Sequence, residues 1–205
     1  MAVPILGNLY TRAVRRWPKL ANLSGINDGW RVERSDSKAI VFTKGPFEVS
    51  MDRYHGSVFL SELLAWERLY MPKGGVEGKT ILDVGAGSGE TALFYFGRGA
   101  KMLVCVEPSH ESAVHLKRNI ERNHWNASAF EEPFSLSRLS IPHDFLKFDA
   151  EGAEAALLSY GGELGPSRIE IHPGIIGRDA SDAIVKKFGL TRISGGKDAA
   201  IYGKD

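Results

Sequence analysis

The sequence predicts an α/β fold in which a Rossmann-like, mostly parallel sheet carries helices on both faces. One observation behind this is a short apolar run at residues 81–84 that ends in the turn Gly-Ala-Gly-Ser-Gly. A helical segment follows, and a second apolar run at 102–106 ends on Glu107. Strand-type and helical segments then alternate, and the last two strand-type runs flank a Ser-Gly-Gly turn at 194–196, which predicts an antiparallel C-terminal hairpin.

Residues 1–60 are predicted to form an accessory N-terminal layer ahead of the main domain, which is expected over 61–205. The first 27 residues contain no acid, and the apolar spacing at 5–17 predicts an amphipathic helix. That helix can pack on its own domain or on a second copy, as in a homo-oligomer; a docking arm for a membrane surface, a partner or nucleic acid is the alternative. A β-hairpin and a third strand are then expected at 30–34, 39–43 and 47–51.

The elements of the main domain are predicted from capping residues and apolar spacing. Ser61 has the side chain of an N-cap, so a helix is expected over 62–70. The first strand of the sheet should begin near residue 79. Further helices are expected over 109–123, 151–159 and 180–188, and further strands over 127–131, 143–149, 167–172, 190–193 and 199–202.

Composition and charge narrow the class of protein. The 205 residues carry a net charge of +1, so no global basic field indicates a nucleic-acid partner. The single cysteine, Cys105, excludes a disulfide framework and a cysteine zinc site and suits a reducing compartment. No apolar run approaches the ~20 residues of a membrane span, and the N-terminus lacks the apolar region of a signal peptide. A cytoplasmic location is therefore expected.

The glycine-rich turn predicts a nucleotide-type cofactor site. Glycines let the backbone approach a ligand closely, and Glu107 can accept protons from both ribose hydroxyls. Asp83 before the turn and Glu90 after it disfavour a pyrophosphate, which prefers a helix N-terminus free of anions. They favour a ligand with an ammonium group, such as S-adenosylmethionine; a nicotinamide or flavin is the alternative. The residues expected to contact the cofactor are Asp83, Gly85, Ala86, Gly87, Gly89, Glu107, Pro108 and Phe130.

A second polar group of residues follows two later strands. In an open α/β sheet, ligands bind at the carboxyl ends of the strands, so Asp149, Glu151 and His172 are candidate catalytic residues. An imidazole such as that of His172 titrates near neutral pH and can act as a general base. Helix capping explains Asp149 and Glu151 nearly as well.

Two further acids lie in the same stretches. Glu154 is expected to be a solvated acid on a helix. Glu170 lies two residues before His172, and together with Asp149 these two are weak candidates for an Mg²⁺ site, in which the ion would acidify an acceptor hydroxyl. The primary expectation is a site without metal.

Four segments resemble the FkbM-type methyltransferases: ILDVGAGSGETAL, VCVEPSHESAVHLKRNIERN, DFLKFDAEGAEAALL and IEIHPG. The resemblance covers roughly residues 50–173, although the stretch 126–133 lacks a clear adenine-contacting acid. It implies a class I S-adenosylmethionine-dependent enzyme. Asp83, Gly85, Gly87 and Glu107 would then hold the cofactor, and Asp149 and Glu151 would be signature acids at the rim.

The resemblance also sets the expected activity, which is O-methylation of a hydroxyl on a small molecule or glycan. Such an acceptor would be the main partner, with no strong nucleic-acid signal. The alternatives are an RNA methyltransferase, with the basic N-terminal helix as its docking arm, and a cofactor-binding module without catalysis.

Overall fold

The computed structural model describes Ala13, residues 16–20, Asn22 and residues 29–205, without the side chains of residues 61–64. The helix predicted over 5–17 lies almost wholly outside the described residues. Where the description begins, a short 3₁₀ helix, η1 (Pro18–Leu20), precedes the strands. Within the described part of the chain, no helix is both long enough and apolar enough to cross a membrane.

The predicted α/β fold is confirmed by a seven-stranded sheet with the order β6-β5-β4-β7-β8-β10-β9. Strands β4 to β8 pair in parallel, while β10 runs antiparallel to both β8 and β9, as the predicted C-terminal hairpin requires. The strands are β4 (Thr80–Val84), β5 (Met102–Val106), β6 (Ala127–Phe130), β7 (Phe145–Phe148), β8 (Ser167–Ile171), β9 (Thr191–Gly195) and β10 (Ala200–Lys204).

Helices cover both faces of this sheet. Ile81 of β4 belongs to an apolar cluster shared with α3 (Arg53–Tyr70) and α4 (Glu90–Phe96). The next residue, Leu82, belongs to a second cluster shared with η3 (Ala153–Ser159) and α7 (Arg178–Phe188). Successive side chains of a strand point to opposite faces, so these continuous apolar strands need cover on both sides. The remaining helices are α5 (His110–Arg122), η2 (Leu136–Ser140) and α6 (Pro173–Ile176).

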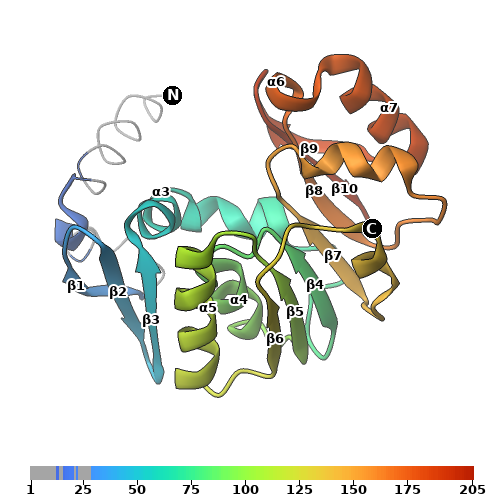
Figure 1. Cartoon of the computed structure of the whole chain (residues 1–205). Helices are drawn as coiled ribbons and strands as arrows, with labels where there is room; N and C mark the ends of the chain where they lie inside the picture. The colour runs from blue at the N-terminus through green and yellow to red at the C-terminus, as the bar shows by residue number, and fades with distance from the viewer. Residues whose placement is uncertain (1–12, 14–15, 21, 23–28) are drawn as a thin grey trace.

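The three N-terminal strands form a separate antiparallel sheet, β1 (Arg31–Ser35), β2 (Ala39–Lys44) and β3 (Phe47–Asp52), as predicted. Figure 1 shows this sheet beside α5 on one flank of the molecule, with β8, β10 and α7 on the other. Asn119 of α5 and Asn123, the residue that caps the C-terminus of this helix, bind the free edge of β3. The amide of Asn119 bonds both the N–H and the C=O of Ser50, at 2.8 and 2.7 Å, and Asn123 does the same at Glu48, at 3.1 and 2.9 Å.

Helix α3 begins nine residues earlier than predicted, because its N-cap is Asp52 rather than Ser61. The Asp52 carboxylate accepts hydrogen bonds from the backbone N–H groups of Tyr54 and His55, at 2.9 and 3.0 Å. Gly56 lets the helix pack closely on β2, since a Cβ there would meet the Ile40 side chain at 3.0 Å. The helix therefore runs through residue 60, and the proposed division of the chain at that point stays a prediction.

Two smaller differences concern the segments after β6 and β7. The strand predicted over 143–149 is shortened to β7, and the helix predicted over 151–159 is the 3₁₀ helix η3. Gly152, with a φ of +87°, separates the two and turns the chain at the end of β7. Asp149 and Glu151 therefore lie in a loop at the carboxyl edge of the sheet.

Candidate active site

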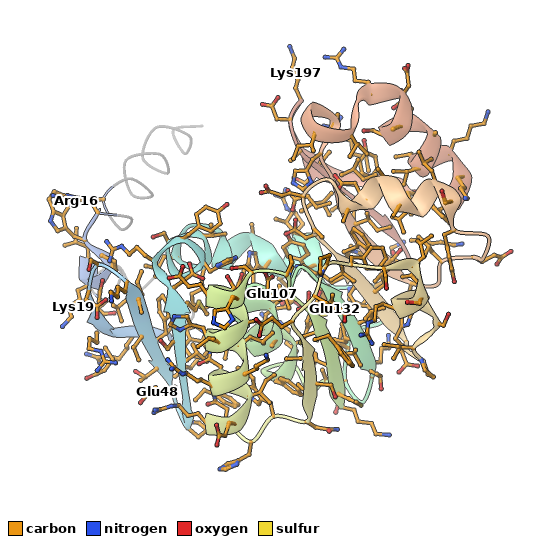
Figure 2. The ribbon with its side chains drawn as sticks, in the orientation of Figure 1. Arg16, Lys19, Glu48, Glu107, Glu132 and Lys197 are labelled. Carbon is orange, nitrogen blue, oxygen red and sulfur yellow. The ribbon has the colours of Figure 1, made fainter. Side chains whose placement is uncertain are left out.

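A cavity of about 580 Å³ opens where β4, β5 and β7 end beneath the first turns of α3. Gly85, Glu107 and Pro108 line it on one side, and Asp149 and Glu151 line it as well. Figure 2 shows Glu107 at the end of β5, close to α3. Five of the residues predicted from the sequence therefore share one cavity. The other predicted residues are not among those that line it: Asp83, Ala86, Gly87, Gly89, Phe130 and His172.

The glycine turn is fixed against the loop that follows β7. Gly85 has a φ of +75°, and a Cβ at this position would lie 1.7 Å from the backbone oxygen of Asp149. No other residue type fits so close a contact in the left-handed region. The turn that precedes α4 and the acid that ends β7 are consequently held in one rigid arrangement.

Glu107 is buried, and backbone groups orient it. One carboxylate oxygen accepts the N–H of Gly87 at 2.8 Å, and the other accepts the N–H of Ser109 at 2.8 Å. A carboxylate oxygen has a second lone pair, so each can still accept a hydroxyl proton from a ligand. This geometry suits the ribose contact that the sequence predicts.

Behind the turn lies a buried ion pair that the sequence did not assign. The Lys147 ammonium is 2.6 Å from the Gly85 carbonyl oxygen and 3.2 Å from Asp83, and 3.8 Å from Asp149. Burial opposes its charge, yet the two carboxylates raise the pKa of Lys147. Thr91 donates to the other oxygen of Asp83 at 2.5 Å. Asp83 therefore supports the turn from inside the protein, with both oxygens turned toward protein groups.

Asp149, Glu170 and His172 meet at the ends of β7 and β8. One possible ligand atom from each lies within 4.8 Å of the other two. His172 is held by Glu154, which accepts its backbone N–H at 2.8 Å and faces its Nδ1 at 3.1 Å. Tyr70 donates to Glu170 at 3.0 Å. We refer to Asp149, Glu170 and His172 as the acid–histidine corner.

The expectation for Glu154 is wrong, because its side chain is completely buried. Its sequence position predicts a solvated helix face for Glu154. In the structure, η3 turns it inward beneath His172, where it fixes the imidazole. Its role is to orient a neighbour in the site.

Glu170 and His172 are the two possible bases of the corner, and their pKa values are shifted by different causes. Burial raises the pKa of Glu170 to about 7, and the charge of Asp149 adds to the rise. The hydrogen bond to Glu154 raises the pKa of His172. Near neutral pH, Glu170 therefore exchanges a proton readily, whereas His172 holds its proton more tightly than an ordinary imidazole does. Glu170 suits the role of base better than His172, to which the sequence reasoning gave it.

Two side chains of the cavity were missed because α3 was predicted to begin too late. Tyr54 and His55 come from its first turn, and both line the cavity. Tyr54 is 66% exposed. Lys147 did leave a signal, since a lysine within the apolar run Phe-Leu-Lys-Phe needs a buried partner. No comparable signal marked residues 53–55.

No known protein-family model matches the chain. The tRNA U34 carboxymethyltransferase of Aliivibrio salmonicida (strain LFI1238) is 33% identical over 96 residues, 44% of this chain and 28% of that protein. The chain spans 21% to 28% of the length of the curated relatives that it matches. This relative acts on tRNA, so the comparison corrects the expected partner, a small molecule or glycan without a nucleic-acid signal. The prediction from the net charge was wrong because a net charge averages over the whole surface and does not show where charged groups cluster.

Two solved structures show the same architecture. The proposed RNA methyltransferase PH1948 from Pyrococcus horikoshii is 20% identical, with a TM-score of 0.52 over 72% of this chain and 82% of that one. TYW2 from M. jannaschii, solved in complex with AdoMet, is 11% identical, with a TM-score of 0.51 over 83% and 85%. These comparisons do not show the FkbM-type subfamily. What they show is the coarser assignment: the chain has the fold of the class I S-adenosylmethionine-dependent methyltransferases.

Proposed function

We propose that this protein is an S-adenosylmethionine-dependent methyltransferase that acts on RNA. The observation that carries the proposal is the cavity, which the glycine turn at Gly85 and Glu107 line together with the rim acids Asp149 and Glu151. A cofactor along the turn would place its reactive end toward that rim, where strands of an open α/β sheet present their catalytic groups. The RNA part is supported by the similarity to a tRNA-modifying enzyme.

The chain's own groups would bind the cofactor as follows. Glu107 would accept hydrogen bonds from the ribose hydroxyls, and the backbone of Gly85 would approach the amino-acid end. When bound, S-adenosylmethionine supplies an electrophilic methyl group on a sulfonium. The protein then has to align the acceptor and remove its proton.

In this proposal Glu170 accepts that proton. It adjoins the cavity through Tyr70, which donates to it at 3.0 Å and itself lines the cavity. Asp149 lines the cavity and keeps the pKa of Glu170 raised, so the glutamate is a base near neutral pH rather than a permanently charged acid. His172, fixed by Glu154, lies 3.7 Å from Glu170 and stabilises the charge that the glutamate carries before it takes the proton.

The convergence of the corner favours one second mechanism, in which Asp149, Glu170 and His172 would hold a divalent cation that would make the acceptor group more acidic. Oxygen and imidazole ligands within 4.8 Å of one another fit such an ion. The contact between Glu154 and Nδ1 would leave Nε2 as the ligand atom, as in many metal sites. Chelation separates the two mechanisms. Activity that EDTA abolishes and Mg²⁺ restores would support the ion, and chelator-resistant activity would support Glu170 as the base.

Aromatic and basic side chains at the cavity rim and on the N-terminal layer offer contacts for RNA. Tyr54 lies exposed at the rim, and the preceding residue, Arg53, donates to the backbone of Arg16 at 3.5 Å. Trp17 is 61% exposed, and Lys19 is exposed beside it. Figure 2 shows Arg16 and Lys19 at the outer edge of the three-stranded sheet. Single-stranded bases stack on such aromatic side chains while cations contact the backbone.

The test is transfer of a labelled methyl group from S-adenosylmethionine to total RNA, to unmodified tRNA transcripts and to a matched panel of sugars and hydroxylated small molecules. We expect label in RNA only, and loss of that label with Glu170→Gln. Label in the small molecules but not in RNA would contradict the proposed acceptor. Cofactor binding without transfer to any acceptor would favour a non-catalytic module.

A further inference from the structure

We infer that His55 forms the subsite for the carboxylate of the cofactor's amino-acid end, so that the N-terminal layer completes the cofactor site of the main domain. The inference rests on the proposed function, because it presumes that S-adenosylmethionine is the ligand. It concerns a residue for which the sequence reasoning gave no role.

The position of His55 supports this role. Its side chain lines the same cavity as Gly85 and Glu107. A Cβ added to Gly87 would lie 2.8 Å from the His55 ring, so the imidazole rests directly on the glycine turn. The amino-acid end of the cofactor is expected along this turn.

The His55 ring is held by Asp52, which is itself held by the glycine turn. Its Nδ1 lies 2.5 Å from the carboxylate of Asp52, the residue that ends β3 and caps α3. The same carboxylate oxygen of Asp52 accepts the Ser88 hydroxyl at 2.6 Å, and Ser88 belongs to the glycine turn. Asp52 is buried, so the layer and the turn together fix the imidazole.

The second nitrogen of His55 is left for a ligand. Among the described residues, the acid nearest to Nε2 is Glu90, at 3.9 Å, which is beyond hydrogen-bond distance. With Nδ1 committed to Asp52, the Nε2–H group is the donor that remains. A donor at this place, next to the turn, can reach a carboxylate lying on the turn.

The positive charge of the His55 imidazolium favours a carboxylate as its partner. The groups that face His55 are acids from three elements: Asp52 from β3, Glu90 from α4 and Glu107 after β5. Burial opposes the charge of the imidazole, but the hydrogen bond to Asp52 and these charges outweigh it and raise the pKa of His55 to about 9. Lys147, the other cation that lines the cavity, already faces the Gly85 carbonyl oxygen and two carboxylates. The imidazolium of His55 is therefore the cation best placed for the cofactor's one anionic group.

The test compares S-adenosylmethionine with decarboxylated S-adenosylmethionine, which is the same molecule without the carboxylate. Calorimetric titration of the full chain at pH 7 should show that the wild type prefers the carboxylated form by about 10- to 100-fold, the range of a charged hydrogen bond. His55→Gln should lose this preference, mainly by weaker binding of S-adenosylmethionine, and His55→Lys should regain part of it. His143→Gln, at the opposite end of β7, is the control and should behave as the wild type.

A second measurement needs no variant and therefore holds even if His55→Gln does not fold. In the wild type, the preference for the carboxylated form should fall as the pH rises through about 9, as the imidazolium loses its proton. Equal wild-type affinities for the two compounds would overturn the inference, as would a preference that His55→Gln keeps. In either case the proposed function would stand, since S-adenosylmethionine still binds. A wild type that binds neither compound would overturn both.

Discussion

Glu170 occupies a place where its charged form is disfavoured by burial and by Asp149, with a pKa of about 7. If it is the base, kcat/KM should rise with pH up to about 7 and then level. Glu170→Gln should lower turnover by about 10²–10⁴-fold without changing cofactor affinity. Tyr70→Phe removes a hydrogen bond that lowers this pKa, so the midpoint should move to higher pH. A midpoint that Tyr70→Phe leaves in place would count against Glu170.

Gly85 shows how tightly the site is built at the level of one atom. Gly85→Ala forces a Cβ against the backbone of Asp149 at a φ of +75°, so the free energy of unfolding should fall by at least about 1–3 kcal/mol. Gly196→Ala is the matched control, because a Cβ there meets nothing within 4 Å. Urea denaturation of both variants measures the difference. Equal losses would mean that the close contact at Gly85 relaxes freely.

At the scale of an element, the start of α3 couples stability to pH. The folded-state pKa of His55 is raised from 6.5 to about 9, so its contribution is fully present below pH 6.5 and is lost as pH rises through about 9. Burial raises the pKa of Glu90 to about 7, so the contribution of Glu90 changes mainly below pH 7. The raised pKa of His172 adds a loss in the same direction as that of His55, so the variant is needed to isolate His55. Between pH 7 and 10 the free energy of unfolding should drop by on the order of 1–3 kcal/mol. Denaturant titrations should show a smaller drop for His55→Gln.

The start of α3 is also the feature of this region that the sequence did not predict. The strands of the layer were predicted because short β-type runs are joined by polar residues, but the helix start was placed at Ser61. Asp52 directly follows the strand predicted over 47–51, and its carboxylate is held by Ser88 and His55, whose side chains reach it only in the folded chain. The acid–histidine corner was within reach, since strand ends converge at one edge of a parallel sheet. The inward turn of Glu154 was not, because it follows from the 3₁₀ geometry of η3.

At the scale of the whole molecule, the fold was predicted and the partner was not. Continuous apolar strands that alternate with helices dictate a parallel sheet covered on both faces. A net charge of +1 says nothing of where the 26 basic residues lie. Figure 2 shows Arg16 on the N-terminal layer and Lys197 on the opposite flank of the molecule. Basic residues therefore lie at separate places on the surface, and a partner can contact one group of them without the other.

That separation gives a test of RNA binding. If Arg16 and Lys19 each contact a phosphate of single-stranded RNA, the double variant Arg16→Ala/Lys19→Ala should bind RNA more weakly. The slope of log affinity against log salt should also decrease by roughly 1 to 1.5. Lys197→Ala should change neither quantity. A double variant with the wild-type slope would place the RNA elsewhere. Fluorescence anisotropy over a series of salt concentrations measures both.

The asparagine contacts between α5 and β3 have a geometric consequence. Residues 119 and 123 are one helical turn apart and rise by about 6 Å along the helix. Their partners, residues 48 and 50, are two positions apart on a strand, which is about 6.6 Å. The distance between the two helix residues therefore matches the distance between the two strand residues, and this match fixes the position of the strand along the helix. Inserting or deleting one residue between the members of either pair would prevent the two contacts from forming together, and the layer would lose its alignment with the turn that Asn119 also holds through the Ser88 carbonyl.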